Sequence, residues 1–224
     1  PDSTTDESDL TIVVNDGTVS TNIKLEFNST TNIAEAEIDE TTFSNALENI
    51  ETDETELKTV IIDIPTAEDA TAYKLTIPAS AVNNTETSEA TVVKTEIATI
   101  TVPSNMLLPE TTIESDKISL VVGKGDKKEL SEELQAEIGD KPLIKLELQI
   151  NGKQVDWENE MAPIKVAVPY QPTQAELADP EHITVWYIDG AGNIIPVTSG
   201  RYDPETGMVT FSVTHFSQYA VVFV

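Results

Sequence analysis

Residues 183–224 constrain the fold more than any other stretch, because short strand-like runs alternate there with turn sequences. Residues 183–188 and 194–197 flank Asp-Gly-Ala-Gly-Asn, a glycine-containing loop typical of a β-hairpin. After the turn sequence Asp-Pro-Glu-Thr-Gly, residues 208–213 alternate in polarity, as in a strand with one buried face. Residues 219–224 are almost wholly apolar, as expected of a strand covered on both faces. We therefore predict that the chain ends in four short β-strands.

Proline ends four apolar runs elsewhere in the chain: IDIP (62–65), LTIP (75–78), ITVP (100–103) and VAVP (166–169). At the end of a strand, proline costs no hydrogen bond inside the sheet. Further strands are expected at residues 10–14, 19–27, 33–38, 60–64, 72–77, 90–95, 96–102, 118–122, 143–150, 153–157 and 162–168. The recurring strand-then-proline pattern indicates repeated β units.

Short helices and one tight hairpin complete the expected elements. Thr42 is expected to cap a helix with apolar residues at positions 43, 46, 47 and 50. A second helix is expected from Ser131 to Gly139, and a single helical turn at residues 174–178. Asn151-Gly152 predicts a two-residue β-hairpin turn.

The predicted fold class is mostly β: two tandem antiparallel β-sandwich-like domains with a few short helices. Residues 1–9 are polar and acidic and are expected to be a linker, so the chain is expected to be part of a longer protein. An N-terminal β domain is predicted over 10–97 and a C-terminal β domain over 98–224. Both tryptophans, Trp157 and Trp186, fall in the second domain.

The charge balance excludes some partners. Asp and Glu total 40 against 13 Lys and Arg, a formal net charge of −27. We therefore expect no binding of nucleic acid, since phosphate recognition needs clustered cations. No apolar run approaches the about 18 residues that a membrane helix needs, so no membrane insertion is expected. Cysteine is absent, which removes disulfides and thiolate chemistry, and no cofactor is expected.

Four stretches of the second half have a specific wording and order: ATITVPSNML (98–107), IGDKPLIKLELQINGKQVDW (138–157), PIKVAVPYQPTQAELADPEHITVWYIDGAGNIIPV (163–197) and RYDPETGMVTFSVTHFSQYAVV (201–222). Together they resemble the segment before the surface-layer homology repeats of many Gram-positive cell-surface proteins and wall-anchored glycanases. SNALENI, TVIIDIP and YKLTIPASAV, between residues 40 and 96, resemble the region just before that segment. The resemblance implies an extracellular, wall-associated protein whose following repeats bind wall-linked polysaccharide. The chain ends at Val224 before any such repeat, so no wall-binding residue is carried over.

Residues 96–170 also resemble, more loosely, the β domain shared by ankyrins, netrin receptors and zonula occludens proteins. The features that match are an ITVP strand followed by NML, then PLIKLEL and APIKVAVPY. Some relatives of that domain cleave themselves at His-Phe-Ser, and the matching positions here are His215, Phe216 and Ser217. Cleavage would need the Ser217 hydroxyl to attack the Phe216 carbonyl while a base accepts its proton. The alternative is a β-corner in which Phe216 anchors the core.

Two other sets of side chains are candidate sites. Turn residues with hard oxygen ligands suit calcium, although the same residue types form turns without a metal: Asp189, Asn193, Asp203 and Glu205. Aromatic residues are candidates for stacking on a glycan: Trp157, Trp186, Tyr187 and Tyr170. Adjacent strand residues point to opposite faces, so one of Trp186 and Tyr187 is expected in the core.

Hydrolysis of an external substrate is not expected. The two histidines, His182 and His215, lie on separate segments. Glu176, Asp179 and Glu181 form a carboxylate cluster in a proline-containing loop, where we expect them to be solvated.

The sequence therefore predicts a non-catalytic structural or spacer module of a secreted bacterial cell-surface protein, with the neighbouring domains of the same polypeptide as its partners. A carbohydrate- or calcium-binding module and a self-cleaving domain are the alternatives.

Overall fold

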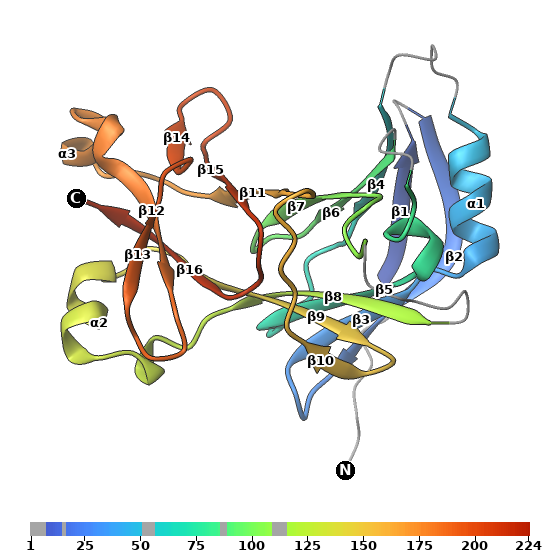
Figure 1. Ribbon diagram of the computed structural model, residues 1–224, viewed down its shortest axis with the longest axis horizontal. Coiled ribbons are helices and arrows are strands. Elements are labelled where there is room, and N and C mark those ends of the chain that lie inside the picture. The colour runs from blue at the N-terminus through green and yellow to red at the C-terminus, as the bar shows by residue number, and fades with distance from the viewer. Residues whose placement is uncertain (1–7, 15–16, 51–56, 86–88, 109–115) are drawn as a thin grey trace.

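The computed structural model describes residues 8–14, 17–50, 57–85, 89–108 and 116–224. Within these ranges, two β-sheets make up most of the fold, and three short α-helices lie at their margins (Figure 1). The prediction of a mostly β, sandwich-like fold is confirmed.

The first sheet, sheet A, contains strands from both ends of the sequence. In spatial order it consists of β14 (Arg201–Asp203), β15 (Met208–Val213), β11 (Ile164–Pro169), β7 (Thr99–Pro103), β6 (Glu89–Lys94), β4 (Lys58–Asp63), β1 (Ser8–Val14) and β2 (Gly17–Asn28).

The second sheet, sheet B, is built in the same way. In spatial order it consists of β13 (Ile194–Val197), β12 (Ile183–Ile188), β16 (Gln218–Phe223), β9 (Leu143–Ile150), β8 (Lys117–Lys124), β5 (Ala72–Pro78), β3 (Ile33–Glu37) and β2, with β10 (Lys153–Val155) paired to β9. The long strand β2 belongs to both sheets, because its first part pairs with β1 and its last residues pair with β3.

Among the described strands, two neighbouring pairs are parallel where antiparallel domains were predicted, and the other pairings are antiparallel as predicted. β3 pairs with β5 and β4 pairs with β6, both in parallel. The chain alternates between the sheets over β3, β4, β5 and β6. After one strand in the other sheet, the chain re-enters the first sheet and runs in its original direction. The two strands of one sheet that are separated in sequence by a strand of the other sheet therefore pair in parallel.

The sheets continue across the predicted domain boundary at residues 97 and 98. This boundary lies in the turn between β6 and β7, and these two strands pair with each other. β5 pairs with β8 in the same way. The division into two domains stays a prediction, but strands on its two sides share both sheets.

The core draws its side chains from both sheets along the molecule. One hydrophobic cluster extends from Leu25 to Val221 and includes Ile62 of sheet A and Leu75 of sheet B. A smaller cluster lies under the second helix and contains Leu134, Ile138, Leu143, Ile188, Ala220 and Val222. β16 contributes to both clusters, so burial on both faces is confirmed for residues 219–222, whereas Phe223 is only partly buried and Val224 is 57% exposed.

The helices are short and capped. They are α1 (Glu40–Glu48), α2 (Glu132–Ile138) and α3 (Gln174–Leu177), with single 3-10 turns at Ala79–Ala81, Lys127–Glu129 and Pro180–His182. The cap of α1 is Asp39 and not Thr42 as predicted, because the Asp39 carboxylate accepts a hydrogen bond from the Thr42 backbone N–H at 2.7 Å. Ser131 caps α2 and Gly139 ends it, as predicted.

The molecule is longest along the sheets (Figure 1). α1 and β1 lie toward one end of this long axis, whereas α2, α3 and the C-terminus lie toward the other. The predicted Asn151-Gly152 hairpin joins β9 to β10, and both turn residues have the positive φ angles that a tight hairpin turn requires. In the part of the chain that the structure describes, no helix has the length and apolarity needed to cross a bilayer.

Candidate functional site

A pocket of about 350 Å³ lies where four segments distant in sequence meet. Its lining comes from the β6–β7 turn, the end of β8 and the loop after it, the segment that follows α2, and the end of β11: Glu96, Ile97, Lys124, Gly125, Lys127, Asp140, Lys141, Pro142, Leu143, Ile144, Val168 and Pro169. Three lysines among the residues that line one pocket are unusual in a chain of net charge −27. The pocket is therefore a candidate anion site.

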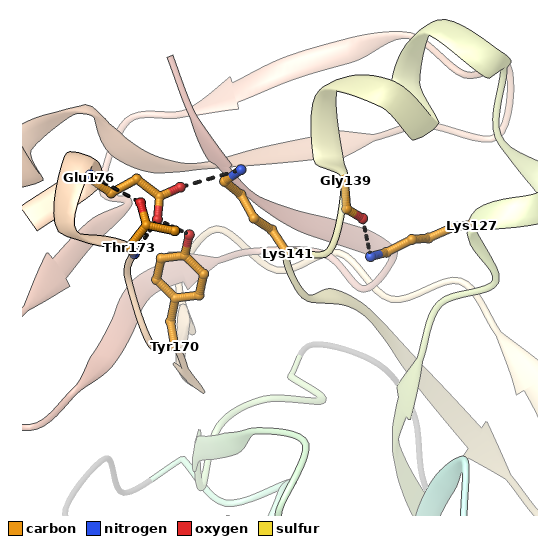
Figure 2. Close-up of polar contacts among 6 residues, drawn as sticks. All are labelled: Lys127, Gly139, Lys141, Tyr170, Thr173 and Glu176. Carbon is orange, nitrogen blue, oxygen red and sulfur yellow. Dashed lines mark hydrogen bonds and ion pairs between the residues drawn. The ribbon is translucent and has the colours of Figure 1, made fainter.

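Two of the three lysine ammonium groups already have partners in the protein (Figure 2). Lys127 Nζ donates to the Gly139 carbonyl at 2.6 Å, where it closes the C-terminal end of α2. Lys141 Nζ lies 3.4 Å from the Glu176 carboxylate. An incoming anion would have to compete with both contacts, so the arrangement is better suited to joining segments than to binding a ligand.

Glu176 is the centre of the polar network beside this pocket (Figure 2). Its carboxylate accepts hydrogen bonds from the Tyr170 hydroxyl at 2.9 Å and from the Thr173 backbone N–H at 2.8 Å. The Thr173 hydroxyl accepts from the Glu176 N–H in return, which makes a capping box for α3. Burial raises the pKa of Glu176, but the hydrogen bonds from Thr173, Tyr170 and Lys141 outweigh it and hold the pKa below its ordinary value.

This network corrects the expectation that Glu176 is solvated with Asp179 and Glu181. Glu176 is only 7% exposed, whereas Asp179 and Glu181 are exposed. The network also uses the hydroxyl of Tyr170, one of the predicted glycan-stacking residues, and burial together with Glu176 raises the pKa of that hydroxyl. Thr173 and Lys141 were missed by sequence reasoning. The Thr-Gln-Ala-Glu sequence carries a capping-box signature, but nothing in the sequence places Lys141 beside it.

The three residues of the predicted self-cleavage corner are held in the fold by separate contacts. The Ser217 hydroxyl donates to the Ile188 carbonyl at 3.4 Å. His215 Nδ1 lies 3.1 Å from the Tyr219 hydroxyl, which also donates to the His215 carbonyl at 2.6 Å. Phe216 packs on Trp157, with 4.9 Å between ring centroids. Among the described contacts, the hydroxyl and the imidazole therefore do not form a nucleophile–base hydrogen bond.

The predicted calcium ligands form turns on two separate loops. Asp189 accepts hydrogen bonds from the backbone N–H of Asn193 at 2.8 Å and from its side-chain amide at 2.9 Å. Asp203 accepts from the Glu205 N–H and the Thr206 hydroxyl, both at 2.9 Å. These bonds lower the pKa of each aspartate, with Asn193 the main cause for Asp189 and Glu205 for Asp203. Their carboxylates stabilise the two turns.

A different group, Asp179, Glu181 and His182, gathers three ligand atoms within 4.8 Å of one another, and it is the one such group among the described residues. His182 Nε2 lies 3.5 Å from an Asp179 oxygen, and Nδ1 contacts the carbonyl oxygen of Val224. All three side chains are exposed. An exposed acidic cluster of this kind needs no metal ion to be stable, so the group does not define a metal centre.

The remaining candidate aromatic residues differ in burial. Trp157 is 5% exposed, and its indole N–H donates to the Met106 carbonyl at 2.9 Å, so it belongs to the core. Tyr187 is partly buried against the main hydrophobic cluster, and Trp186 packs against the smaller one from the opposite face of β12. As expected, these two neighbours point to opposite faces, but neither is fully buried, and each packs against a different cluster.

Trp186 also lines a groove of about 390 Å³ between α2 and the loop that joins β12 to β13. The other lining residues are Ser131, Glu133, Leu134, Glu137, Gly192, Asn193 and Ile194. Sequence reasoning identified Trp186 and Asn193 but missed the two glutamates. Their spacing of four residues places both on one face of α2, but only the packing of α2 on β16 brings that face to Trp186.

Comparison with protein-family models, with curated proteins and with solved structures found no match to this chain.

Proposed function

We propose that this chain is a non-catalytic structural module of a secreted bacterial cell-surface protein, and that it holds neighbouring segments of its polypeptide at a fixed separation. The observation that carries the proposal is the continuity of the two sheets. Hydrogen-bonded strands follow one another without a break from β13 to β14 by way of β2. A continuous pair of sheets with a shared core resists bending better than two domains joined by a linker.

The polar side chains of the candidate sites support a structural role. The carboxylates of Glu176, Asp189 and Asp203 accept hydrogen bonds that shape a helix cap and two turns. The Ser217 hydroxyl and the His215 ring bond to different partners. A catalytic constellation requires a nucleophile, a base and a site for the reacting atoms within reach of one another.

The extracellular location rests on the resemblance to the segment that precedes surface-layer homology repeats. The net charge of −27 is compatible with it, because such a surface repels copies of itself and stays soluble. Under this proposal the wall polysaccharide is bound by repeats of the parent protein, and the chain acts as the spacer before them.

Rigidity between the two ends can be measured with spin labels, because the chain has no cysteine and any introduced pair is unique. Asn45→Cys on α1 and Ala178→Cys after α3 place labels at exposed positions near opposite ends. We expect a single narrow distance distribution by pulsed electron paramagnetic resonance. Thr30→Cys with Asn45→Cys, both at exposed positions before the predicted boundary, is the matched control pair. The proposed spacer role would be refuted if the distance distribution between the two ends had two maxima or were much broader than that of the control pair.

The location is tested separately on cells that express the parent protein. An antibody against this chain should label intact cells. Labelling that requires permeabilised cells would contradict the extracellular assignment.

A further inference from the structure

The groove beside Trp186 has an apolar wall formed by three elements. Leu134 of α2 lies in the smaller hydrophobic cluster, and Trp186 of β12 packs against that cluster. Ile194 at the start of β13 is 40% exposed, which is high for a large apolar side chain. Trp186 is partly buried, so the rest of its indole contributes to the groove. The volume of about 390 Å³ lies within the range of sites that bind small ligands.

The rim of the groove is acidic. Glu133 and Glu137 are both exposed and lie four residues apart on α2. In the described part of the chain, neither carboxylate has an ion pair, and no Lys, Arg or His is among the residues that line the groove. Two like charges at this spacing repel each other, and a cation bound between them would remove that repulsion.

The loop opposite α2 supplies a fixed polar group. The Asn193 side-chain amide donates to Asp189 Oδ2 at 2.9 Å, and the Asn193 backbone N–H donates to Asp189 Oδ1 at 2.8 Å. The first bond holds the Asn193 side chain and the second holds its backbone, and together they leave the side-chain amide oxygen as an acceptor. The groove thus combines a rigid acceptor, two carboxylates and an indole.

From these features we infer that the groove binds a sugar unit that carries a free amino group, such as a glucosamine residue of an oligosaccharide. The apolar face of the pyranose ring would stack on Trp186, while its ammonium group would lie near Glu133 and Glu137. An ammonium beside an indole and unpaired carboxylates is favoured by both cation–π and Coulomb attraction. The hydroxyl groups of the sugar supply the donors that the Asn193 oxygen accepts. This binding activity goes beyond the spacer role and does not depend on it.

Titration of the whole chain with a glucosamine hexamer tests the inference, with isothermal calorimetry and tryptophan fluorescence as readouts. Trp157 is 5% exposed, so a change in emission on binding should come from Trp186. We expect saturable binding that weakens as salt is added. The fully N-acetylated hexamer, which has the same rings without the positive charge, should bind at least about tenfold more weakly.

Variants test the aromatic part and the acidic part of the groove separately. Trp186→Ala should weaken binding of the glucosamine hexamer by about tenfold or more. The double variant Glu133→Gln with Glu137→Gln changes only exposed side chains, so it should fold normally, and it should reduce both the affinity and the salt dependence. Glu132→Gln, on the same helix but outside the groove lining, is the control and should bind as the wild type does.

Three results with the sugar hexamers would overturn the inference. One is the absence of saturable binding, and another is equal binding of the acetylated and free hexamers. The third is binding that is unchanged by the double glutamine variant. Hexalysine serves as the peptide comparison. If it bound as tightly as the glucosamine hexamer with the same dependence on Trp186, the groove would be a site for basic peptides and the amino-sugar assignment would be wrong.

Discussion

Replacement of Glu176 by alanine should destabilise the fold far more than is usual for a residue in a short helix beside a loop. The carboxylate is 7% exposed and accepts hydrogen bonds from Tyr170 and Thr173, with the Lys141 ammonium 3.4 Å away. Loss of the capping interaction costs about 1 kcal/mol. The Tyr170 hydroxyl left without its acceptor costs about 1–3 kcal/mol more. We expect a decrease of about 2–4 kcal/mol in the free energy of unfolding.

Urea unfolding followed by circular dichroism measures this change. Glu176→Gln keeps the size of the side chain and one acceptor oxygen but loses the charge, so about half of the effect is expected. Glu181→Ala removes a nearby exposed carboxylate and should stay within about 0.5 kcal/mol of wild type.

The effect of Glu176→Ala should also depend on pH. The pKa of Glu176 in the fold lies below its ordinary value of 4.5, so the stabilisation is present above pH 4.5 and is lost as the pH falls through the lower folded value. The difference between wild type and variant should therefore be full at neutral pH and narrow in acid. A difference under about 0.5 kcal/mol at neutral pH, or one that does not change down to pH 3, would refute the reasoning.

Three further perturbations test other parts of the structure. Gly125→Ala would place a Cβ 2.5 Å from Leu143 Cγ, so urea unfolding should show a loss of about 1–3 kcal/mol, whereas Gly190→Ala meets nothing within 4 Å and should be near neutral. Equal effects of the two glycine variants would contradict the packing argument. Burial and the nearby Glu96 raise the pKa of Tyr73 to about 12, so its contribution to stability is present below pH 10 and is lost as the pH rises toward 12. Tyr73→Phe should flatten the alkaline decline measured by urea unfolding between those values, and an unchanged slope would count against this assignment. Denaturing mass spectrometry should show one intact chain of 24.4 kDa, because the Ser217 hydroxyl is bonded away from His215; a fragment that begins at Ser217 would reverse this expectation.

The contacts at the candidate sites show which side-chain roles depend only on residues nearby in the sequence. The turn roles of Asp189 and Asp203 follow from sequence, because each carboxylate bonds to backbone or side chains within four residues. The capping box of Thr173 and Glu176 is local in the same sense. The ion pair with Lys141 is not, since it joins the segment after α2 to α3. For this reason sequence reasoning wrongly placed Glu176 in solvent.

The sequence by itself determined most local elements: where strands lie, that β5, β7 and β11 end at proline, and where Asn151-Gly152 turns the chain. β4 ends at Asp63, before the predicted Pro65. These features depend on backbone preferences and on the alternation of side chains over a few residues. Only the tertiary structure decided which strands pair, that β2 belongs to both sheets, and that β3–β5 and β4–β6 are parallel. Many strands here are apolar on at least one face, so their side-chain pattern suits several neighbours equally well. Pairing is selected when all strands bury their apolar faces in one core, and that choice also brings Glu133 and Glu137 to Trp186.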